Sequence, residues 1–309
     1  MGLGKTISTL TAIKKLIYEE LEISSVLVVA PKRVAESVWG FEVEKWAHLK
    51  GLTVSKIAGN AKQRRQALNV EADIYTLGRD NVAWICGQYG GSMLPFDMLV
   101  IDELSSFKSP KSNRFRALKK TQPSFKRVVG LTGTPAPNGI IDIWSQIYLL
   151  DRGERLGKFV TGFRERFFTH DPYAHKYTVD KGKEDRIYEL IGDICISMKA
   201  EDYLDLKKPI ENIIRIEFDE ATQKMYKDFE REKVLELLDG PEEGISVANA
   251  AALSNKLLQF ANGAVYDEDK NYHVVHDFKI EALKELVEDA NGKPVLIAYG
   301  YKHDFERIM

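Results

Sequence analysis

Cysteine is scarce in this chain of 309 residues. Cys86 and Cys195 are the only two, and they stand far apart in unrelated contexts. A disulfide framework and a cysteine-based zinc cluster are therefore excluded, and a reducing compartment is expected. The sequence also lacks any apolar run near the roughly 20 residues that span a bilayer, and no signal peptide precedes the first motif. We therefore expect a soluble, cytoplasmic protein without a membrane partner.

Neither sign of charge is in excess. Lys and Arg number 44 and Asp and Glu number 46, which gives a net charge of -2 and a pI near 6.4. Any contact with nucleic acid must come from a local basic surface, because the chain as a whole is no polycation. With 44% hydrophobic and 29% charged residues the composition is globular. The length predicts about two domains.

Short apolar runs rich in β-branched residues alternate with helical patterns over the first half. The runs cover residues 25–30, 72–76, 98–102 and 127–132, and the helical patterns cover 35–46, 61–68 and 113–121. This alternation predicts an α/β fold, in which helices cover both faces of a parallel sheet. Ligands of such sheets bind beyond the carboxyl ends of the strands, where the runs end in Pro31, Thr76, Asp102 and Thr132.

The second half is less regular. Residues 140–206 are predicted to form helices and loops, and 211–218 to form a new strand. We then expect helices at 220–238, 246–260 and 279–289, with a hairpin at 265–275. The end of the chain is predicted to hold a buried strand at 294–299 and the start of a helix at 303–309. Because a strand followed by an unfinished helix is a poor domain ending, we expect a fragment at this end.

The first residues carry a phosphate-binding pattern. Gly4-Lys5-Thr6 matches the last three positions of the loop G-x-x-x-x-G-K-[ST], and a helical pattern begins directly after it. The N–H groups and dipole of a helix N-terminus attract anions, so Lys5 would reach the outer phosphates and the Thr6 hydroxyl would bind Mg²⁺. A chance Gly-Lys-Thr is the alternative. The loop would open two residues before Met1 and its preceding strand is absent, so a truncated start is also expected.

Two further segments place polar residues at strand ends. Asp102 and Glu103 close one apolar run; in a phosphoryl-transfer site the first carboxylate holds Mg²⁺ and the second orients or deprotonates the attacking water. The segment Thr132-Gly133-Thr134 closes the next run, and its hydroxyls could relay hydrogen bonds between a nucleotide site and a neighbouring surface. Either segment alone would be an ordinary strand end. Their order after Gly-Lys-Thr favours an ATP site.

With these motifs the chain resembles the Swi/Snf-type branch of the superfamily-two helicase-like ATPases, especially its phage-encoded members. The matching segments, in the family's order and spacing, are Met-Gly-Leu-Gly-Lys-Thr (1–6), Val-Ala-Pro-Lys-Arg-Val (29–34), Val-Ile-Asp-Glu-Leu-Ser (100–105) and Gly-Leu-Thr-Gly-Thr-Pro-Ala-Pro-Asn (130–138). The resemblance implies a RecA-like P-loop NTPase lobe at 1–150 with its first strand missing. A helical insert at 151–208 and the start of a second RecA-like lobe at 209–309 would follow.

The resemblance also implies a function: an ATP-dependent DNA translocase or helicase, at work in a bacterial or phage-infected host cell, with DNA a more fitting partner than RNA. Carried over residue by residue, the ATP-binding positions would be Gly2, Gly4, Lys5, Thr6, Asp102 and Glu103, with Thr6 and Asp102 on Mg²⁺ and with Glu103 and Lys5 catalytic. Pro31, Lys32 and Arg33 match a segment that touches the nucleic-acid backbone, and Thr132, Gly133 and Thr134 match the element that couples hydrolysis to strand movement.

Two departures from the family bear on activity. Ser105 stands where many relatives have His or Asp, although its hydroxyl can still form a hydrogen bond. No arginine-bearing motif follows in the sequence, and because an arginine finger contributes roughly 10³ to 10⁵ in rate, we expect this chain alone to hydrolyse ATP weakly or not at all. Two alternatives stay open: a non-catalytic nucleic-acid-binding or interaction module, and a P-loop NTPase that acts on something other than nucleic acid.

Other residues have a structural interpretation beside a functional one. The basic stretch 108–120 could contact phosphates or form a solvated helix face. Arg164 and Arg166, set among phenylalanines, could line a DNA channel, although such aromatics more often belong to the core. Trp39 and Trp46 are predicted to pack on one helical face, and His170 and His175 are expected in a surface loop rather than a metal site.

Overall fold

A computed structural model describes residues 3–91, 93–133, 136, 139–173, 176–198, 203, 210–238 and 247–309. The chain divides into two units, Met1–Lys207 and Lys208–Met309. Among the described residues, every helix falls short of the length and apolar character that a membrane span needs.

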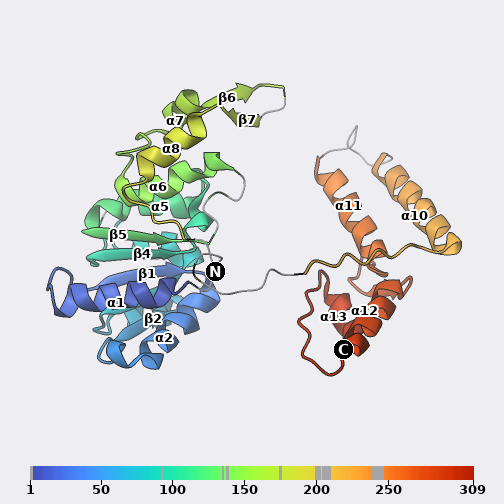
Figure 1. The fold of residues 1–309 in the computed structure, drawn as a ribbon, viewed down its shortest axis with the longest axis horizontal. Coiled ribbons are helices and arrows are strands. Elements are labelled where there is room, and N and C mark those ends of the chain that lie inside the picture. Colours follow the sequence, from blue (N-terminus) through green and yellow to red (C-terminus); the bar gives the residue numbers. More distant parts are fainter. Residues whose placement is uncertain are drawn as a thin grey trace. The chain divides into compact units, whose positions relative to one another are not determined.

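A five-stranded parallel sheet forms the centre of the first unit. Its strands are β1 (Val26–Ala30), β2 (Val54–Ile57), β3 (Ile74–Gly78), β4 (Met98–Asp102) and β5 (Arg127–Leu131). They lie in the order β2-β3-β1-β4-β5, which the labels β2, β1, β4 and β5 follow upwards in Figure 1. The α/β fold with a parallel sheet is therefore confirmed, and β2 is a strand that the sequence patterns missed.

Alternate residues of the strands enter two buried clusters, one on each face of the sheet. On one face Val26, Val28 and Val100 pack with residues of α1 (Lys5–Tyr18) and α2 (Trp39–Lys45). On the other face Leu27, Val29 and Ile101 pack with several shorter helices. These are α3 (Ala61–Leu68), α4 (Val82–Gln88), α5 (Asn113–Thr121) and α6 (Ile143–Asp151). Both faces are covered because strands that are apolar throughout have no side left for solvent.

Two carboxylates fasten the amino edge of the sheet. Asp73, just ahead of β3, accepts hydrogen bonds from the Thr53 amide (2.7 Å) and hydroxyl (2.8 Å), just ahead of β2. Asp97, just ahead of β4, accepts hydrogen bonds from the amide and hydroxyl of Ser24, both at 2.7 Å, and Lys126 pairs with it at 2.9 Å. These contacts join the starts of neighbouring strands: β2 with β3 through Asp73, and β4 with both β1 and β5 through Asp97. They lie at the edge opposite to the strands' carboxyl ends.

After α6 the first unit continues as α7 (Val160–Phe167), an antiparallel hairpin of β6 (Phe168–Asp171) and β7 (Lys176–Val179), and α8 (Lys183–Ile191). Figure 1 shows this hairpin projecting beyond α7 and α8. Residues 140–206 were expected to hold helices and loops alone, so the hairpin corrects that prediction. Its pattern was hard to recognise because three of the four β6 side chains are exposed.

The second unit is mainly helical. It contains α10 (Glu220–Leu238), α11 (Val247–Ala261), a hairpin of β8 (Ala264–Tyr266) and β9 (Tyr272–Val274), α12 (Phe278–Asp289) and α13 (Lys302–Ile308). The strands predicted at 211–218 and 294–299 are wrong: both segments lack strand pairing, and Leu296 is 99% exposed. The apolar, β-branched pattern is present there, but a strand exists only where a second backbone pairs with it.

Short helical turns complete the chain. A π-helix, η1 (Val34–Val38), precedes α2 directly. The 3₁₀ turns are η2 (Ala47–Leu49), η3 (Arg79–Asn81), η4 (Leu104–Phe107), η5 (Gln122–Ser124) and η6 (Ile140–Asp142).

Candidate functional site

The N-terminus of α1 offers a place for an anion. Gly4 precedes the helix with φ of 70°, a left-handed conformation that glycine adopts without strain. The helical hydrogen bonds begin with the Ser8 amide donating to the Gly4 carbonyl at 3.0 Å, so the amides of residues 5–7 lie ahead of the ladder. The first turn holds no acidic side chain. Lys5 and Thr6, predicted as phosphate and Mg²⁺ ligands, lie in this turn, and Gly2 lies outside the described residues.

Asp102 ends β4 at the carboxyl edge of the sheet. Burial raises the pKa of this half-buried carboxyl above its ordinary value, while hydrogen bonds from the Trp39 indole and the Glu103 amide partly oppose the rise. The negative charge of Glu103 raises the pKa of Asp102 further, and the positive charge of Lys5 lowers it. Lys5 and Asp102, which the sequence places almost 100 positions apart, therefore interact electrostatically in the structure.

Glu103 follows with a left-handed backbone, φ of 61°, which is uncommon for a residue with a Cβ. Its Oε1 accepts hydrogen bonds from two hydroxyls, Ser105 and Thr132, the second at 3.1 Å. The predicted carboxylate and the first residue of the predicted coupling segment are thus in direct contact. Ser105, where the family pattern differs, supplies the other donor. Gly133 is exposed, and Thr134 lies outside the described residues.

Residues 31–33 lie at the same edge of the sheet, directly after β1. Lys32 and Arg33 are exposed. A Cβ added to Gly78, the last residue of β3, would lie 3.6 Å from the Lys32 Cα, an ordinary contact distance, so the end of β3 and residue 32 are neighbours. The η3 turn follows Gly78 directly, so Arg79 and Asn81 come just after the end of β3, at the same edge of the sheet. The sequence patterns missed these two residues, although their position after a predicted strand was a usable signal.

Trp39 has a role beyond the packing that the sequence patterns assigned to it. It is fully buried, but its Nε1 also donates a hydrogen bond of 3.1 Å to Asp102 Oδ2. Trp46 does not share its surroundings: it is 37% exposed, and its Nε1 donates to Glu42 at 2.7 Å. The backbone of Trp46 is extended rather than helical, which is why the two indoles leave the common face that a spacing of seven predicts.

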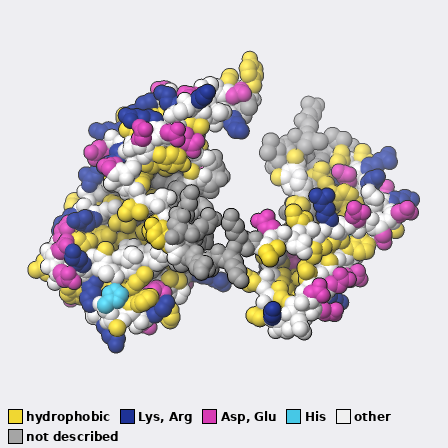
Figure 2. All heavy atoms as spheres, viewed as in Figure 1, with side chains coloured by type: hydrophobic (Ala, Val, Ile, Leu, Met, Phe, Trp, Pro, Cys, Tyr) yellow, Lys and Arg dark blue, Asp and Glu magenta, His cyan; other side chains and the backbone are white. Residues whose placement is uncertain are grey.

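The basic stretch 108–120 is partly engaged within the molecule. Arg114 pairs with Asp80 at 3.5 Å, and the Lys119 ammonium lies 4.3 Å from the centre of the Tyr148 ring. Lys111 and Lys120 are exposed. On the face that Figure 2 shows, basic and acidic side chains are interspersed over the first unit.

The aromatic residues around Arg164 and Arg166 belong to the core. Phe163, Phe167 and Phe168 are buried, and their rings pack against one another. Arg164 stacks over Tyr177, and Arg166 over Phe167. This contact set matches the packing interpretation rather than a channel for bases. His170 is exposed and stacks on Tyr177, and His175 lies outside the described residues.

The donor set at the carboxyl edge fits Mg²⁺. Thr6 brings a hydroxyl and Asp102 a carboxylate, both oxygen ligands of the kind that Mg²⁺ prefers. Among the described residues no three His, Cys, Asp or Glu side chains gather as metal ligands. A nucleotide-bound Mg²⁺ needs no such cluster, because phosphate oxygens and water complete its shell.

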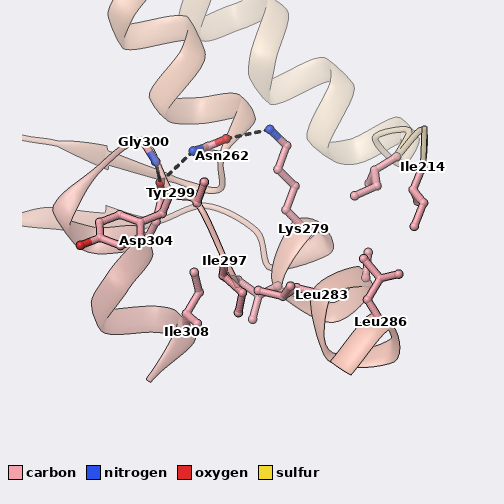
Figure 3. Close-up of a pocket in the computed structure, with 14 residues that line it drawn as sticks. Ile214, Asn262, Lys279, Leu283, Leu286, Ile297, Tyr299, Gly300, Asp304 and Ile308 are labelled. Carbon is pink, nitrogen blue, oxygen red and sulfur yellow. Dashed lines mark hydrogen bonds between the residues drawn. The ribbon is translucent and has the colours of Figure 1, made fainter. Parts of the chain in front are cut away.

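A cavity in the second unit is lined by residues of that unit alone. It measures about 530 Å³ and its lining is mostly aliphatic. Figure 3 shows Asn262 at its rim, between Lys279, which donates to Asn262 Oδ1 at 2.7 Å, and Asp304, which accepts from Asn262 Nδ2 at 2.9 Å. A smaller cavity of about 270 Å³ in the first unit lies between Lys108, Asp142 and Arg164. Neither cavity is lined by a residue predicted to bind ATP or Mg²⁺, although Lys108 and Arg164 were weighed as nucleic-acid contacts.

Comparison with known families agrees with the geometry. The sequence model of a family described as the SNF2-related domain matches residues 1–265 of the 309. The chain belongs to this family. The SNF2-related domain thus covers the whole first unit and part of the second.

Relatives within the family differ greatly in length. Protein p41 of Acyrthosiphon pisum secondary endosymbiont phage 1 is 39% identical over 327 aligned positions, which include all of this chain and 69% of the phage protein. The helicase SWR1 of Saccharomyces cerevisiae is 29% identical over 53% of this chain, but that match spans only 11% of SWR1. An ATP-dependent helicase of Mycoplasma genitalium is 30% identical over 47% of the chain and 14% of its own length.

A solved structure has the same fold. The SWI2/SNF2 ATPase core of Sulfolobus solfataricus, determined in complex with dsDNA, superimposes with a TM-score of 0.54 and 22% identity. The match covers 94% of this chain and 58% of the Sulfolobus chain. The chain therefore has the fold of a SWI2/SNF2 ATPase core, and it spans a little over half of the length of that neighbour.

Proposed function

We propose that this chain binds Mg²⁺-ATP at the carboxyl edge of its parallel sheet and is the motor portion of an ATP-dependent DNA translocase or helicase. Lys5 and the amides at the start of α1 would receive the phosphates, with Gly2 and Gly4 forming the loop. Thr6 and Asp102 would hold the metal ion, and Glu103 would orient or deprotonate the attacking water. Membership of the SNF2-related domain family supports the use of ATP.

One observation carries this proposal. The Glu103 carboxylate accepts hydrogen bonds from Ser105 and Thr132, while the neighbouring Asp102 feels the charge of Lys5. Two of the predicted motifs, 29 positions apart at Glu103 and Thr132, are therefore joined by a hydrogen bond, and Lys5 of the third lowers the pKa of Asp102 through its charge. A structural strand end would not require a lysine, two acids and two hydroxyls to converge where ligands of α/β sheets bind.

The chain's own groups would divide the chemistry among them. Lys5 would balance charge on the outer phosphates, and Glu103, held through Oε1, would present its other oxygen to a water molecule. Mg²⁺, when bound, would neutralise phosphate charge. Thr132 donates to the same carboxylate and is the first residue of the segment 132–134. A movement of the Glu103 side chain on hydrolysis would therefore act directly on this segment.

The DNA contact is proposed for residues 31–33 with the adjoining η3 turn. Lys32 and Arg33 are exposed, which suits contacts to phosphate oxygens, and Arg79 follows the end of the neighbouring strand β3. The helicase relatives and the neighbour solved with dsDNA support DNA as the track. Such contacts carry no base specificity, so the proposal is one of backbone tracking.

Nucleotide binding is the first test. Isothermal titration with a non-hydrolysable ATP analogue and Mg²⁺ should show binding by the chain, which Lys5→Ala abolishes or greatly weakens. Turnover that disappears in Lys5→Ala would support the site while contradicting the expected weakness of hydrolysis. Absence of binding by the folded wild-type chain would overturn the proposed function.

DNA binding is the second test. Fluorescence anisotropy with labelled duplex DNA over a salt series should give a steep loss of affinity with salt. The double variant Lys32→Ala/Arg33→Ala should reduce the slope by about 1–2, while Lys50→Ala, an exposed lysine ahead of β2 at the opposite edge, should leave it unchanged. Equal slopes for all three proteins would exclude residues 31–33 as the contact. DNA binding without nucleotide binding would favour the non-catalytic module.

A further inference from the structure

The indole of Trp39 connects two parts of the proposed site that are far apart in sequence. Its Nε1 donates to Oδ2 of Asp102 at 3.1 Å, across 63 positions of the chain. Trp39 has no exposed surface, and it packs in the cluster that contains Leu10 and Ile13 of α1. The orientation of the indole is therefore set by core packing against the helix that begins at Lys5.

A π-helix places Trp39 in this position. Residues 32 to 45 form one continuous helical segment, in which Val34–Val38 make a π-turn directly before Trp39. A π-turn holds one residue more than an α-turn, so everything after it rotates by about 100° relative to a regular helix. Such turns are frequent at functional sites. The rotation brings Trp39, rather than a neighbour, against the end of β4.

The hydrogen bond matters because Asp102 is half-buried. Burial disfavours its charged form, and the indole N–H is the first of the groups that counter this effect. Without that donor, Oδ2 would lose a fixed partner in a place where water has limited access. Groups that hold metal ligands in this way typically change metal affinity by roughly 10- to 100-fold when they are removed.

We propose that Trp39 is a positioning residue for the Mg²⁺ site: its buried indole N–H holds the Asp102 carboxylate in the orientation that receives Mg²⁺-nucleotide. This inference rests on the proposed function. The hydrogen bond from Trp39 to Asp102 would also connect residues 32–33 to the nucleotide site, because these residues begin the helical segment that carries the indole.

The chain offers a matched pair of variants. Trp39→Phe keeps an aromatic ring in the core and removes the N–H. Trp46→Phe, seven residues later, removes an indole N–H that bonds the Glu42 carboxylate instead. Both would be titrated with the non-hydrolysable ATP analogue, once with Mg²⁺ and once in EDTA. Trp39→Phe should bind the Mg²⁺ complex roughly 10- to 100-fold more weakly with unchanged affinity in EDTA, and Trp46→Phe should behave as wild type.

A spectroscopic measurement on the wild type keeps the test decisive if Trp39→Phe does not fold. The four tryptophans give indole N–H signals in ¹H–¹⁵N spectra, and the Phe variants, or Asp102→Ala, assign them. Addition of Mg²⁺-ADP should shift the Trp39 signal more than ADP in EDTA does, and leave that of Trp46 in place.

The outcomes separate the two proposals. A wild type that binds Mg²⁺-nucleotide, together with a folded Trp39→Phe variant of equal affinity, would overturn the role of Trp39 alone. So would a Trp39 signal that does not respond to Mg²⁺. A wild type that binds no Mg²⁺-nucleotide would overturn the proposed function and this inference with it. A loss of affinity that is equal with Mg²⁺ and in EDTA would show a merely structural role.

Discussion

Replacement of Asp97 by Asn tests how the amino edge of the sheet is held. Burial alone would raise the pKa of this carboxyl, but the Ser24 hydroxyl and amide and the Lys126 ammonium more than offset it and lower the pKa from 3.8 to about 2. That difference corresponds to about 2 kcal/mol of stabilisation when the group is ionised. The side chain is only 22% exposed, so solvent screening removes a small part of this figure.

The pH range follows from the sign of the shift. The folded pKa lies below the ordinary value, so the stabilisation is complete well above pH 4 and is lost as the pH falls towards 2. We expect Asp97→Asn to lower the free energy of unfolding by about 2 kcal/mol at pH 6 and by only about 1 kcal/mol at pH 3. The effect becomes smaller because the Asp97 carboxyl of the unfolded wild-type chain, with its ordinary pKa of 3.8, takes up a proton between pH 6 and pH 3. This protonation stabilises the unfolded state.

The assay can be confined to the first unit. All four tryptophans lie within Met1–Lys207, so urea unfolding followed by tryptophan fluorescence reports that unit and not the second. Asp269→Asn, an exposed acid in the second unit, is the control and should leave the transition unchanged at both pH values. An Asp97→Asn effect of equal size at pH 6 and pH 3, or no effect at pH 6, would refute the reasoning.

Three further predictions concern packing and burial. Leu10→Ala removes a fully buried side chain of α1 and should cost about 2–5 kcal/mol of unfolding free energy by the same fluorescence assay; an unchanged midpoint would contradict the core assignment. Gly130→Ala should cost about 1–3 kcal/mol because its Cβ would lie 2.4 Å from Leu104 Cδ2, and a second change, Leu104→Ala, should offset part of this loss if the clash is its cause. Burial lowers the pKa of His276, so its imidazole proton signals in NMR should titrate below pH 6.5, and a transition at or above that value would show that the ring is solvated. Since the folded pKa is lowered, the second unit should lose stability as the pH falls through this transition.

Local patterns predicted most elements of the first unit. The apolar runs indicated β1, β3, β4 and β5, and α3 and α5 begin and end where the helical periodicity placed them. For each of these elements the apolar run or the helical periodicity lies within the element's own residues. The strand β2 differs: it is four residues long, contains Ser55 and Lys56, and belongs to the sheet only because β3 pairs with it.

Pairing explains the opposite error as well. Residues 294–299 carry the composition of a strand and were predicted as one, yet no strand forms there. The hydrogen bonds of a strand belong to two segments, so one segment's composition cannot decide the matter.

The site divides in the same way. Sequence order placed Lys5, Asp102 and Thr132 at one edge of the sheet, because parallel strands bring their ends together. The hydrogen bond from Trp39 to Asp102 could not be predicted, since it depends on the phase of a helix that contains a π-turn. The individual roles of these residues stay predictions until binding is measured.

Because Asp73 and Asp97 lie at the amino edge of the sheet, the contacts that align the strands are separate from the proposed binding groups. These two carboxylates tie strand starts together at the amino edge, while the groups proposed for nucleotide and DNA stand at the carboxyl edge. Substitutions at the second edge can therefore change chemistry while strand alignment is maintained from the first. Exposed residues at the carboxyl edge, such as Lys32 and Arg33, can be replaced without disturbing the hydrogen bonds that align the strand starts, whereas the buried Trp39 serves packing and the proposed site together.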